Sequence, residues 1–373
     1  MRALLFVSLC MVCVATAAAD DAAFRPLFNG VDLSGWVPVN TAPSTWTVSD
    51  GMLVCSGKPT GELRTDRMYQ NFILELEWRH LVPRGNAGVF VWADDITARG
   101  VPFHRSIEVQ VLENAYGNTE SHTTHGDIFP IHGTTMKPEN GHGGMRAFPT
   151  EWRSNPSPEW NHYRIECIDG SVSLAVNGKV VTRGHECSLR KGYICLESEG
   201  GVVNYRNLRI QELPGEPLED QYVAIADRGY RSLYTGVDLS GWQTESTAWQ
   251  PADWVLRTTD EAGKDDVLIS ERSQAGGSLM FDLRRRESGA AVQVEFCGVT
   301  IELTAQDSEV GSKLSPQGQW DRLEMTVAAG HLSVAINDQL VIVNKPVTTA
   351  AGPIRLTPGG GVDLAGLYLR VGE

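Results

Sequence analysis

Two acidic residues and an amide recur at short spacing within residues 107–113, where apolar and polar side chains alternate. Glu108 and Gln110 share one side of such a strand because neighbouring side chains point to opposite faces, and the intervening apolar residues then face a core. A bulge after Leu112 would bring Glu113 to the polar side. Carboxyl groups on that face can act as general acid or base, and the amide can orient a ligand. A plain solvated strand face is the alternative interpretation.

A long loop rich in histidine follows this segment. Six of the nine histidines fall within residues 104–162. His125 and Asp127 are two residues apart, and an imidazole beside a carboxylate suits proton transfer at neutral pH. His122, His125 and Asp127 are also metal-ligand types, but their spacing matches neither a helix nor a zinc finger, so no metal site is predicted. No cofactor is expected, and binding of Ca²⁺ is left open. Lys137 is a candidate donor to a substrate.

Three residues before the loop are further candidates for substrate contacts. Asn86 is a candidate donor, and strict alternation from it places Trp92 on the same side of a strand. On the Glu108 face, the indole of Trp92 could stack on the apolar surface of a sugar ring, whereas a core position is the equal alternative. Arg64 follows a turn and is either a cation that faces the substrate or a plain surface arginine.

Short alternating segments dominate the chain, and helical periodicity is scarce. Residues 72–78, 106–112, 172–176 and 203–210 alternate, and each run is bounded by Gly, Asn, Asp or Pro. Many short strands separated by turn residues are typical of an all-β sandwich. We therefore predict an all-β fold with few or no helices.

A repeat in the sequence predicts that the same fold occurs twice in the chain. Residues 28–36 return as residues 234–242, with seven of nine positions identical. Such a repeat indicates two copies of one unit. Three later matches, such as Val176-Asn177-Gly178 with Ile336-Asn337-Asp338, have an offset of 160 instead of 206. The second copy is therefore about 46 residues shorter.

The missing stretch corresponds to the loop after Glu108, so only the first copy is expected to hold a full site. The second copy has Thr304 in the place of Gln110. Long structured loops on a rigid sandwich commonly carry function. The predicted units are a signal peptide at 1–19, a first domain at 24–213, a linker at 214–224 and a shorter second domain at 225–372.

Composition excludes several classes of function. The formal net charge is -14 and no basic run stands out, which argues against binding nucleic acid or an anionic membrane surface. Arg2, the apolar run 3–14 and the small residues 15–19 predict a cleavable secretory signal with a cut near Ala19. We expect an exported protein, periplasmic or secreted, without membrane insertion.

Five of the seven cysteines remain after removal of the signal. An odd number scattered over a long chain is not a disulfide framework. One bridge among Cys167, Cys187 and Cys195 is an alternative, and buried small apolar residues are the favoured interpretation.

The first copy carries a series of motifs in a fixed order. They lie at residues 30–36, 46–53, 71–79, 85–89, 108–112, 159–164, 176–178 and 205–210. Together they resemble the 3-keto-disaccharide hydrolase domain family over nearly all of residues 24–213. The resemblance implies a concanavalin A-like jelly roll with a sugar site on its concave face, in an exported protein that acts on oxidised glycosides. The second copy resembles the same fold but keeps mainly scaffold positions.

The family resemblance makes cleavage of 3-keto-glycosides the leading hypothesis, with an oligosaccharide or glycoside as substrate. A ketone at C3 acidifies the hydrogen on C2, so a base can remove it and the anomeric substituent can leave. Glu108 would be base or acid and Gln110 would orient the sugar, while His125 and Asp127 are candidates for the second proton transfer. Arg64, Asn86 and Lys137 are candidate donors.

Two alternatives stay open. A non-catalytic carbohydrate-binding module uses the same fold, although an avidity array would keep both sites. Laminarinase-type glycosidases carry Glu-x-Asp-x-x-Glu, which corresponds to Glu108, Gln110 and Glu113 here. Gln110 in the place of the aspartate argues against two-carboxylate hydrolysis in that arrangement.

Overall fold

The computed structural model describes residues 23–116, 125–305 and 310–372. These residues fold into two antiparallel β-sandwiches of jelly-roll type, so the prediction of an all-β fold is confirmed. Two short 3₁₀ helices are present in the described part, η1 (Asp220–Tyr222) and η2 (Gly311–Lys313). The signal peptide predicted at residues 1–19 and His122 lie outside the described residues.

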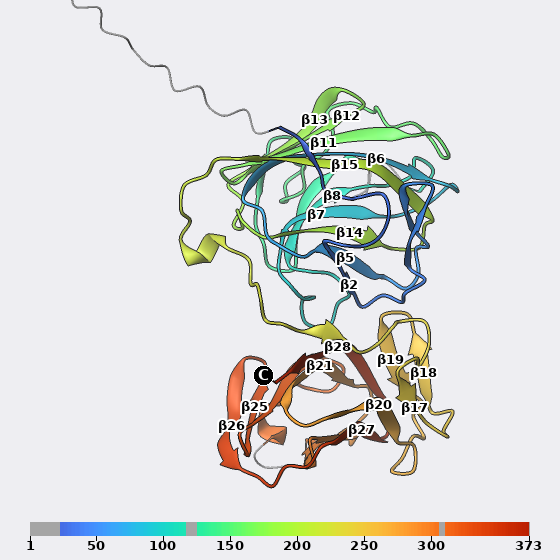
Figure 1. Cartoon of the computed structure of the whole chain (residues 1–373), viewed down its shortest axis with the longest axis vertical. Helices are drawn as coiled ribbons and strands as arrows, with labels where there is room; N and C mark the ends of the chain where they lie inside the picture. The colour runs from blue at the N-terminus through green and yellow to red at the C-terminus, as the bar shows by residue number, and fades with distance from the viewer. Residues whose placement is uncertain (1–22, 117–124, 306–309, 373) are drawn as a thin grey trace, which may run out of the picture.

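Two sheets form the first domain (Figure 1). The long sheet has the order β10-β13-β12-β11-β6-β15-β4-β3, with β1 paired to β15. Its strands are β1 (Arg25–Pro26), β3 (Trp46–Ser49), β4 (Met52–Cys55), β6 (Asn71–His80), β10 (Lys137–Pro138), β11 (Asn161–Ile168), β12 (Ser171–Val176), β13 (Lys179–His185) and β15 (Val203–Leu213). The other sheet, called the site sheet below, has the order β2-β5-β14-β7-β8-β9. Its strands are β2 (Trp36–Val39), β5 (Gly61–Thr65), β7 (Gly88–Ala93), β8 (Ser106–Gln110), β9 (Ile128–Ile131) and β14 (Tyr193–Ser198).

The second domain repeats this plan with a long sheet of order β18-β19-β28-β21-β24-β25-β26, to which β16 is added, and a short sheet of order β17-β20-β27-β22-β23. The long-sheet strands are β16 (Arg231–Ser232), β18 (Trp249–Ala252), β19 (Val255–Thr258), β21 (Gly277–Arg285), β24 (Trp320–Ala328), β25 (His331–Ile336), β26 (Gln339–Pro346) and β28 (Val362–Val371). The short-sheet strands are β17 (Trp242–Gln243), β20 (Leu268–Gln274), β22 (Ala291–Phe296), β23 (Val299–Leu303) and β27 (Gly352–Gly359).

Alternation along each strand builds the two cores. In β6, Leu74, Leu76 and Trp78 are buried between the sheets of the first domain, while Glu75 and Glu77 face outward. Burial of a large apolar side chain contributes about 1.5–3 kcal/mol. Each domain has its own apolar cluster, so each sandwich is a separate packing unit.

The repeated sequence positions make repeated contacts. Trp36 Nε1 donates to the carbonyl of Leu27 at 3.2 Å, and Trp242 Nε1 donates to the carbonyl of Leu233 at 2.8 Å. In the later match, Asn177 Oδ1 accepts from the backbone N–H of His162 and Asn337 Oδ1 from that of Arg322. The shared motifs are therefore scaffold contacts that close each sandwich.

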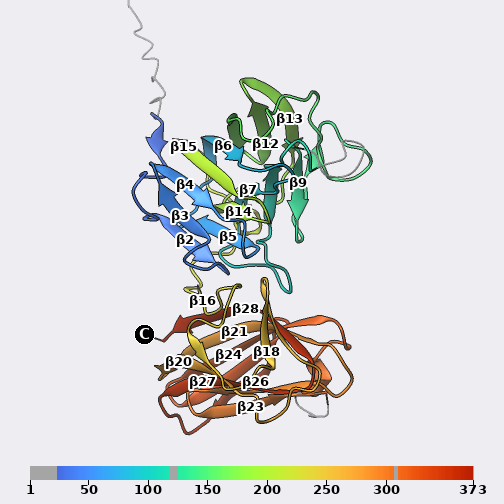
Figure 2. The same ribbon diagram turned by 90° about the vertical axis from the view of Figure 1, so that its right-hand side faces the viewer.

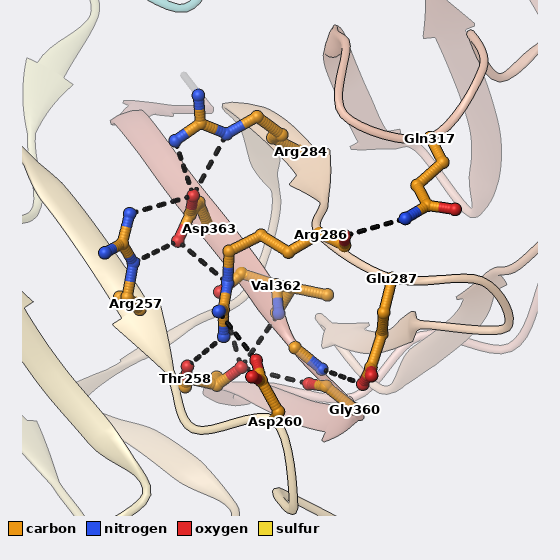
Figure 3. Close-up of polar contacts among 11 residues, drawn as sticks. Arg257, Thr258, Asp260, Arg284, Arg286, Glu287, Gln317, Gly360, Val362 and Asp363 are labelled. Carbon is orange, nitrogen blue, oxygen red and sulfur yellow. Dashed lines mark hydrogen bonds and ion pairs between the residues drawn. The ribbon is translucent and has the colours of Figure 1, made fainter.

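Ion-pair networks cover the outer faces of both long sheets. Burial alone would raise the pKa of Glu75, but hydrogen bonds from Arg209 and Arg164 lower it overall. In the second domain, the fully buried carboxylate of Asp363 accepts from Arg257 at 2.7 Å and from Arg284 at 2.6 Å (Figure 3). Because both domains have a carboxylate held by two or more arginines on this face, we assign the arginine cluster of Figure 3 a structural role.

The two domains contact each other through the outer face of the second domain's long sheet, where β21 and β28 lie next to the first domain (Figures 1 and 2). Tyr368 Oη accepts from Asn40 Nδ2 at 2.9 Å and lies 2.8 Å from Thr97 Oγ1. The backbone N–H of Gly100 donates to Asp282 Oδ2 at 2.8 Å. An apolar cluster joins the same surfaces and consists of Val39, Ile96, Tyr230, Met280 and Tyr368.

All five cysteines of the described residues are buried free thiols, which agrees with the favoured interpretation of the sequence. Burial raises the pKa of Cys187 to about 12 and that of Cys55 to about 11, so these thiols stay protonated. No helix in the described ranges has the length and apolar character needed to cross a membrane.

Candidate active site

The candidate site lies on the outer face of the site sheet. The same alternation that points β5, β7, β8 and β14 into the core leaves their polar side chains on the opposite face. The strand register places Glu62 opposite Glu197 and Phe90 opposite Glu108. Core-facing neighbours in these strands are Leu63, Val89, Val109 and Leu196. Carboxyl groups from three separate strands are thereby gathered on one face.

Glu108 and Glu197 face each other across Gly88. A Cβ at Gly88 would lie 2.9 Å from Glu108 Oε1 and 2.9 Å from Glu197 Oε2, closer than real Cβ contacts allow. Glycine at this position therefore leaves the space that the two carboxyl groups occupy. Glu197 Oε2 has no hydrogen-bond partner among the described residues.

A hydrogen-bond chain connects Gln110 to Glu199. Gln110 Nε2 donates to Asn86 Oδ1 at 2.8 Å and to the carbonyl of Ala87 at 3.0 Å. Asn86 Nδ2 donates to Glu199, and the charge of Glu199 contributes to the raised pKa of Glu197. The structure thus brings the predicted residues Asn86, Gln110 and Glu108 together, and adds Glu197 and Glu199 to them.

Burial controls the electrostatics of this cluster. Glu108 is 7% exposed and Glu197 is 1% exposed. Desolvation raises the pKa of Glu108 well above its ordinary value, and the charge of Glu199 adds to the rise. Desolvation and the neighbouring Glu108 likewise raise the pKa of Glu197. Carboxyl groups with raised pKa values can exchange protons near neutral pH, which is the property that general acid–base chemistry requires.

Asp127 reaches the edge of this cluster together with a cation. Arg146 Nη1 donates to the buried carboxylate of Asp127 at 2.9 Å, and the guanidinium lies 3.4 Å from the ring centroid of Phe129. Phe129 is the cross-strand neighbour of Glu108. The charge of Arg146 opposes the rise in the pKa of Glu108. Asp127 and Arg146 therefore form one wall of the site.

A second buried group lies on the β5 side of the face. The backbone N–H of His104 donates to Glu62 Oε1 at 2.9 Å, and its Nδ1 is bonded to Glu62 Oε2. Cys195 Sγ lies 3.7 Å from the same ring nitrogen. One oxygen, nitrogen or sulfur atom of each of these three side chains lies within 4.8 Å of the other two. Among the described residues, they are the group whose types and spacing could hold a metal ion. The direct bond between Glu62 and His104 pairs those two side chains with each other, and Cys195 packs against Phe90 and Tyr193.

His125 lies in a different place from the carboxyl groups. Its ring packs edge-on against Trp152 with centroids 3.9 Å apart. It lines a cavity of about 180 Å³ with Asn140, His142, Phe148 and Trp152 among its other walls. Burial lowers the pKa of His125 to about 4, so the imidazole is neutral at physiological pH. The prediction that His125 and Asp127 lie together as a proton-transfer pair is wrong, because Asp127 is paired with Arg146 instead.

Trp92 is not on the Glu108 face. It is fully buried in the core, and its Nε1 donates to the carbonyl of Gln70 at 2.8 Å. The pairing of β7 with β14 slips between Tyr193 and Cys195, and Trp92 has a φ of 55° in the left-handed region. This β-bulge inserts one residue and reverses the alternation, which is why the expected stacking position for Trp92 was wrong.

Three other residues that were predicted to contact the substrate are bonded to neighbouring residues of the chain. Glu113 accepts backbone N–H bonds from Arg84 at 2.7 Å and Ala115 at 2.8 Å, so it holds loops together instead of facing a substrate. Lys137 is exposed on β10 of the long sheet, where it pairs with Glu186 at 2.5 Å, away from the site sheet.

Arg64 is buried on β5, with its guanidinium 4.1 Å from the ring centroid of Tyr193. Its Nη1 donates to the carbonyl of Thr65 at 2.7 Å. Alternation places Arg64 on the same face as Glu62, so it stays a candidate cation of the site.

The second domain lacks this arrangement. Glu302, which corresponds in sequence to Glu108, is exposed on β23. The positions of Cys195 and Glu197 are occupied by Arg355 and Thr357 at the offset of 160. The described part of the chain therefore has the carboxyl cluster in the first domain alone.

Sequence reasoning missed Glu62, Glu197, Glu199 and His104. Glu197 and Glu199 alternate with Leu196 and Ser198, the same pattern that identified Glu108. No long loop follows them, so they lack the second signal that accompanied Glu108 in the sequence. Pairing between strands distant in sequence brings them to Glu108, and a single sequence does not contain that pairing.

No curated protein matches the chain. Two crystal structures of candidate glycosyl hydrolases from Parabacteroides distasonis are similar to it at 22% and 24% identity, with TM-scores of 0.41 and 0.40. Each similarity covers 51% of this chain, and 94% and 100% of the respective structure. The carbohydrate-binding module CBM66 from Bacillus subtilis is similar at 12% identity with a TM-score of 0.34, over 48% of this chain and 95% of the module.

The family model described as a 3-keto-alpha-glucoside-1,2-lyase-like domain matches residues 23–211, which is more than half of the chain and contains the whole carboxyl cluster. The chain belongs to this family of carbohydrate-active proteins.

Proposed function

We propose that the first domain cleaves 3-keto-glycosides by elimination of the anomeric substituent followed by addition of water. The observation that carries this proposal is the pair of buried carboxyl groups, Glu108 and Glu197, that face each other across Gly88. The family match supports the substrate class.

The reaction needs two proton transfers on one sugar ring. A base takes the proton from C2, the electrons form the C1–C2 double bond, and the C1–O bond to the leaving group breaks. An acid gives a proton to that leaving oxygen. Water then adds its hydroxyl to C1 and a proton to C2, which yields the 3-keto sugar. Two carboxyl groups with raised pKa values, one ionised and one protonated, can fill both roles.

We assign the base to Glu108 and the acid to Glu197. Glu108 lies near Arg146, whose charge favours the ionised form, whereas Glu197 lies between two other carboxyl groups, which favour its protonated form. Gln110 and Asn86 form the hydrogen-bonded row next to the pair and would orient the sugar hydroxyls. Arg146 and Arg64 are the cations that we propose stabilise negative charge on the C3 oxygen as the enolate forms.

We further propose that this enzyme is exported. The residues ahead of the first domain have the composition of a secretory signal, and a protein at the cell envelope would meet glycosides before uptake. Mass spectrometry of the mature N-terminus after expression in a secreting host tests this: a start near Asp20 supports export, and an intact Met1 in the cytoplasm contradicts it.

Product analysis tests the reaction itself. The purified chain is incubated separately with a 3-keto-disaccharide and with the unoxidised disaccharide, and the released sugars are identified by mass spectrometry. We expect cleavage of the 3-keto substrate alone. Cleavage of the unoxidised sugar would favour a glycosidase, and binding of either without turnover would favour a carbohydrate-binding module.

A further inference from the structure

The second domain touches the first at two loops that lead directly into the site. One loop leads into β5, whose second residue is Glu62, and the other precedes β8 and includes His104. Thr60, two residues before Glu62, is bonded to Asp253 of the second domain. Gly100, four residues before His104, is bonded to Asp282 of the second domain. Glu62 and His104 then bond to each other.

The contact between Asp253 and Thr60 is bidentate. The backbone N–H of Thr60 donates to Asp253 Oδ1 at 2.7 Å, and Thr60 Oγ1 donates to Oδ2 at 2.7 Å. Hydrogen bonds to a charged acceptor are shorter and stronger than neutral ones. The two bonds fix both the backbone and the side chain of Thr60.

On its other side the same loop is joined to β14. Ser198 Oγ donates to the carbonyl of Pro59 at 2.7 Å, and the backbone N–H of Gly200 donates to the carbonyl of Gly57 at 2.8 Å. Ser198 and Gly200 alternate with Glu197 and Glu199. The loop is therefore held between the second domain and the end of the strand that carries Glu197.

Asp253 occupies a turn that the first domain also has. It follows β18, has a φ of 59° and precedes β19; Asp50 follows β3, has a φ of 51° and precedes β4. Asp50 is exposed and its side chain contacts the neighbouring Ser49. The same turn residue thus serves a local role in one copy and an interdomain role in the other.

From these contacts we infer that the second domain is needed for the geometry of the site. Asp253 is a positioning residue: it holds Thr60 and thereby fixes the position of Glu62 relative to Glu197. Glu62 and Glu197 are cross-strand partners, so displacement of the loop changes the spacing of the carboxyl face. The catalytic effect of Asp253 rests on the proposed function of the first domain, whereas its effect on the loop does not.

Three variants of the full chain test this inference. Asp253→Gly removes both acceptors without strain, because glycine accepts the positive φ of this turn. Asp253→Asn keeps an oxygen acceptor for the Thr60 N–H and an amide that can donate to its hydroxyl oxygen. Asp50→Gly makes the same change at the equivalent turn and is the control.

Hydrogen exchange of the peptide covering residues 60–65 and kcat/KM on a 3-keto-disaccharide are measured for each variant. We expect faster exchange and about a tenfold loss of kcat/KM for Asp253→Gly, with Asp253→Asn and Asp50→Gly close to wild type. Wild-type exchange in Asp253→Gly would overturn the positioning role. Equal losses of activity in Asp253→Gly and Asp253→Asn would also overturn it. In that case activity would depend on the negative charge of Asp253, which acts on the pKa of Glu199, and not on its hydrogen bonds to Thr60.

The two proposals fail in distinguishable ways. If the wild-type chain does not cleave the 3-keto substrate, the proposed function fails while the exchange data still decide the role of Asp253. If the wild type is active and Asp253→Gly exchanges faster yet keeps full activity, the loop contact has no catalytic consequence and this inference fails alone.

Discussion

Glu108 Oε1 and Glu197 Oε2 lie on either side of the space that a Cβ of residue 88 would fill, each 2.9 Å from that point. The two residues belong to β8 and β14, which are separated in the sheet by β7. On β7, Phe90 is the register partner of Glu108, and Gly88, two residues earlier, lacks the Cβ that would fill the space between the carboxyl groups. This relationship joins two carboxyl groups 89 positions apart in sequence into one site.

Substitution of Gly88 by alanine should separate the carboxyl pair. The new methyl group would meet both carboxylate oxygens and Phe90, so at least one glutamate has to move. We expect at least a tenfold loss of kcat/KM on a 3-keto-disaccharide, with the fold retained. Gly352→Ala, at the start of β27 where no atom lies within 4 Å of the added carbon, is the control and should be neutral. Equal activity of both variants would argue against a site at Gly88.

The raised pKa of Glu108 should make the folded state less stable as pH rises. The unfolded chain loses this proton near the ordinary carboxyl pKa, while the folded chain keeps it to higher pH, so the native state binds more protons in between. Stability is then lost progressively up to the raised pKa and stays lower above it. Glu108→Gln, which has no proton to lose, should therefore raise Tm more at pH 8 than at pH 4. A Tm gain that is the same at both pH values would contradict a raised pKa.

Removal of Arg146 should lower the stability of the folded chain. Its partner Asp127 is fully buried, and loss of the cation from a buried ion pair costs about 3 kcal/mol. Arg146→Ala should lower the free energy of unfolding in urea by that order, and Arg146→Lys by less because a cation remains. Exposed Arg183, which lies 3.7 Å from exposed Glu139, provides the control, since Arg183→Ala should change little.

The free thiols should be unreactive in the folded protein. All five cysteines of the described residues are buried, and burial raises the pKa of Cys195 and Cys167 far above the range where thiolate forms. Titration of the mature chain with an aromatic disulfide reagent should detect no thiol before denaturation and five afterwards. Fewer than five thiols in denaturant, without added reductant, would reveal a disulfide.

Much of the fold follows from local sequence, because alternation and turn residues are short-range signals. The apolar residues of β6, β8 and β15 were identifiable as core from their period of two. The repeated phrase ending at Trp36 and Trp242 also fixed the duplication, and the structure gives both tryptophans the same hydrogen bond. Fold prediction succeeded where each residue's environment is set by its neighbours in the chain.

Only some residues of the site could be predicted from these short-range patterns. Glu108 and Gln110 were found because they share one strand, but Glu197 and Glu62 join them through pairing of strands far apart in sequence. Trp92 was misplaced because one inserted residue reversed the alternation of β7. His125 was grouped with Asp127 from spacing alone, whereas Arg146 is the partner that Asp127 has in space. Long-range pairing and single-residue bulges are the features that a periodic pattern does not contain.

The most direct test of the central claim compares the wild type with Glu108→Gln on one 3-keto-disaccharide and on its unoxidised form, with both rates corrected for the enzyme-free reaction. We predict that the wild type releases the 3-keto sugar from the oxidised substrate alone. Glu108→Gln should bind that substrate, keep a Tm no lower than wild type and show no turnover above the enzyme-free rate. Full activity of Glu108→Gln, or equal cleavage of the unoxidised disaccharide by the wild type, would contradict the assignment of Glu108 as the base.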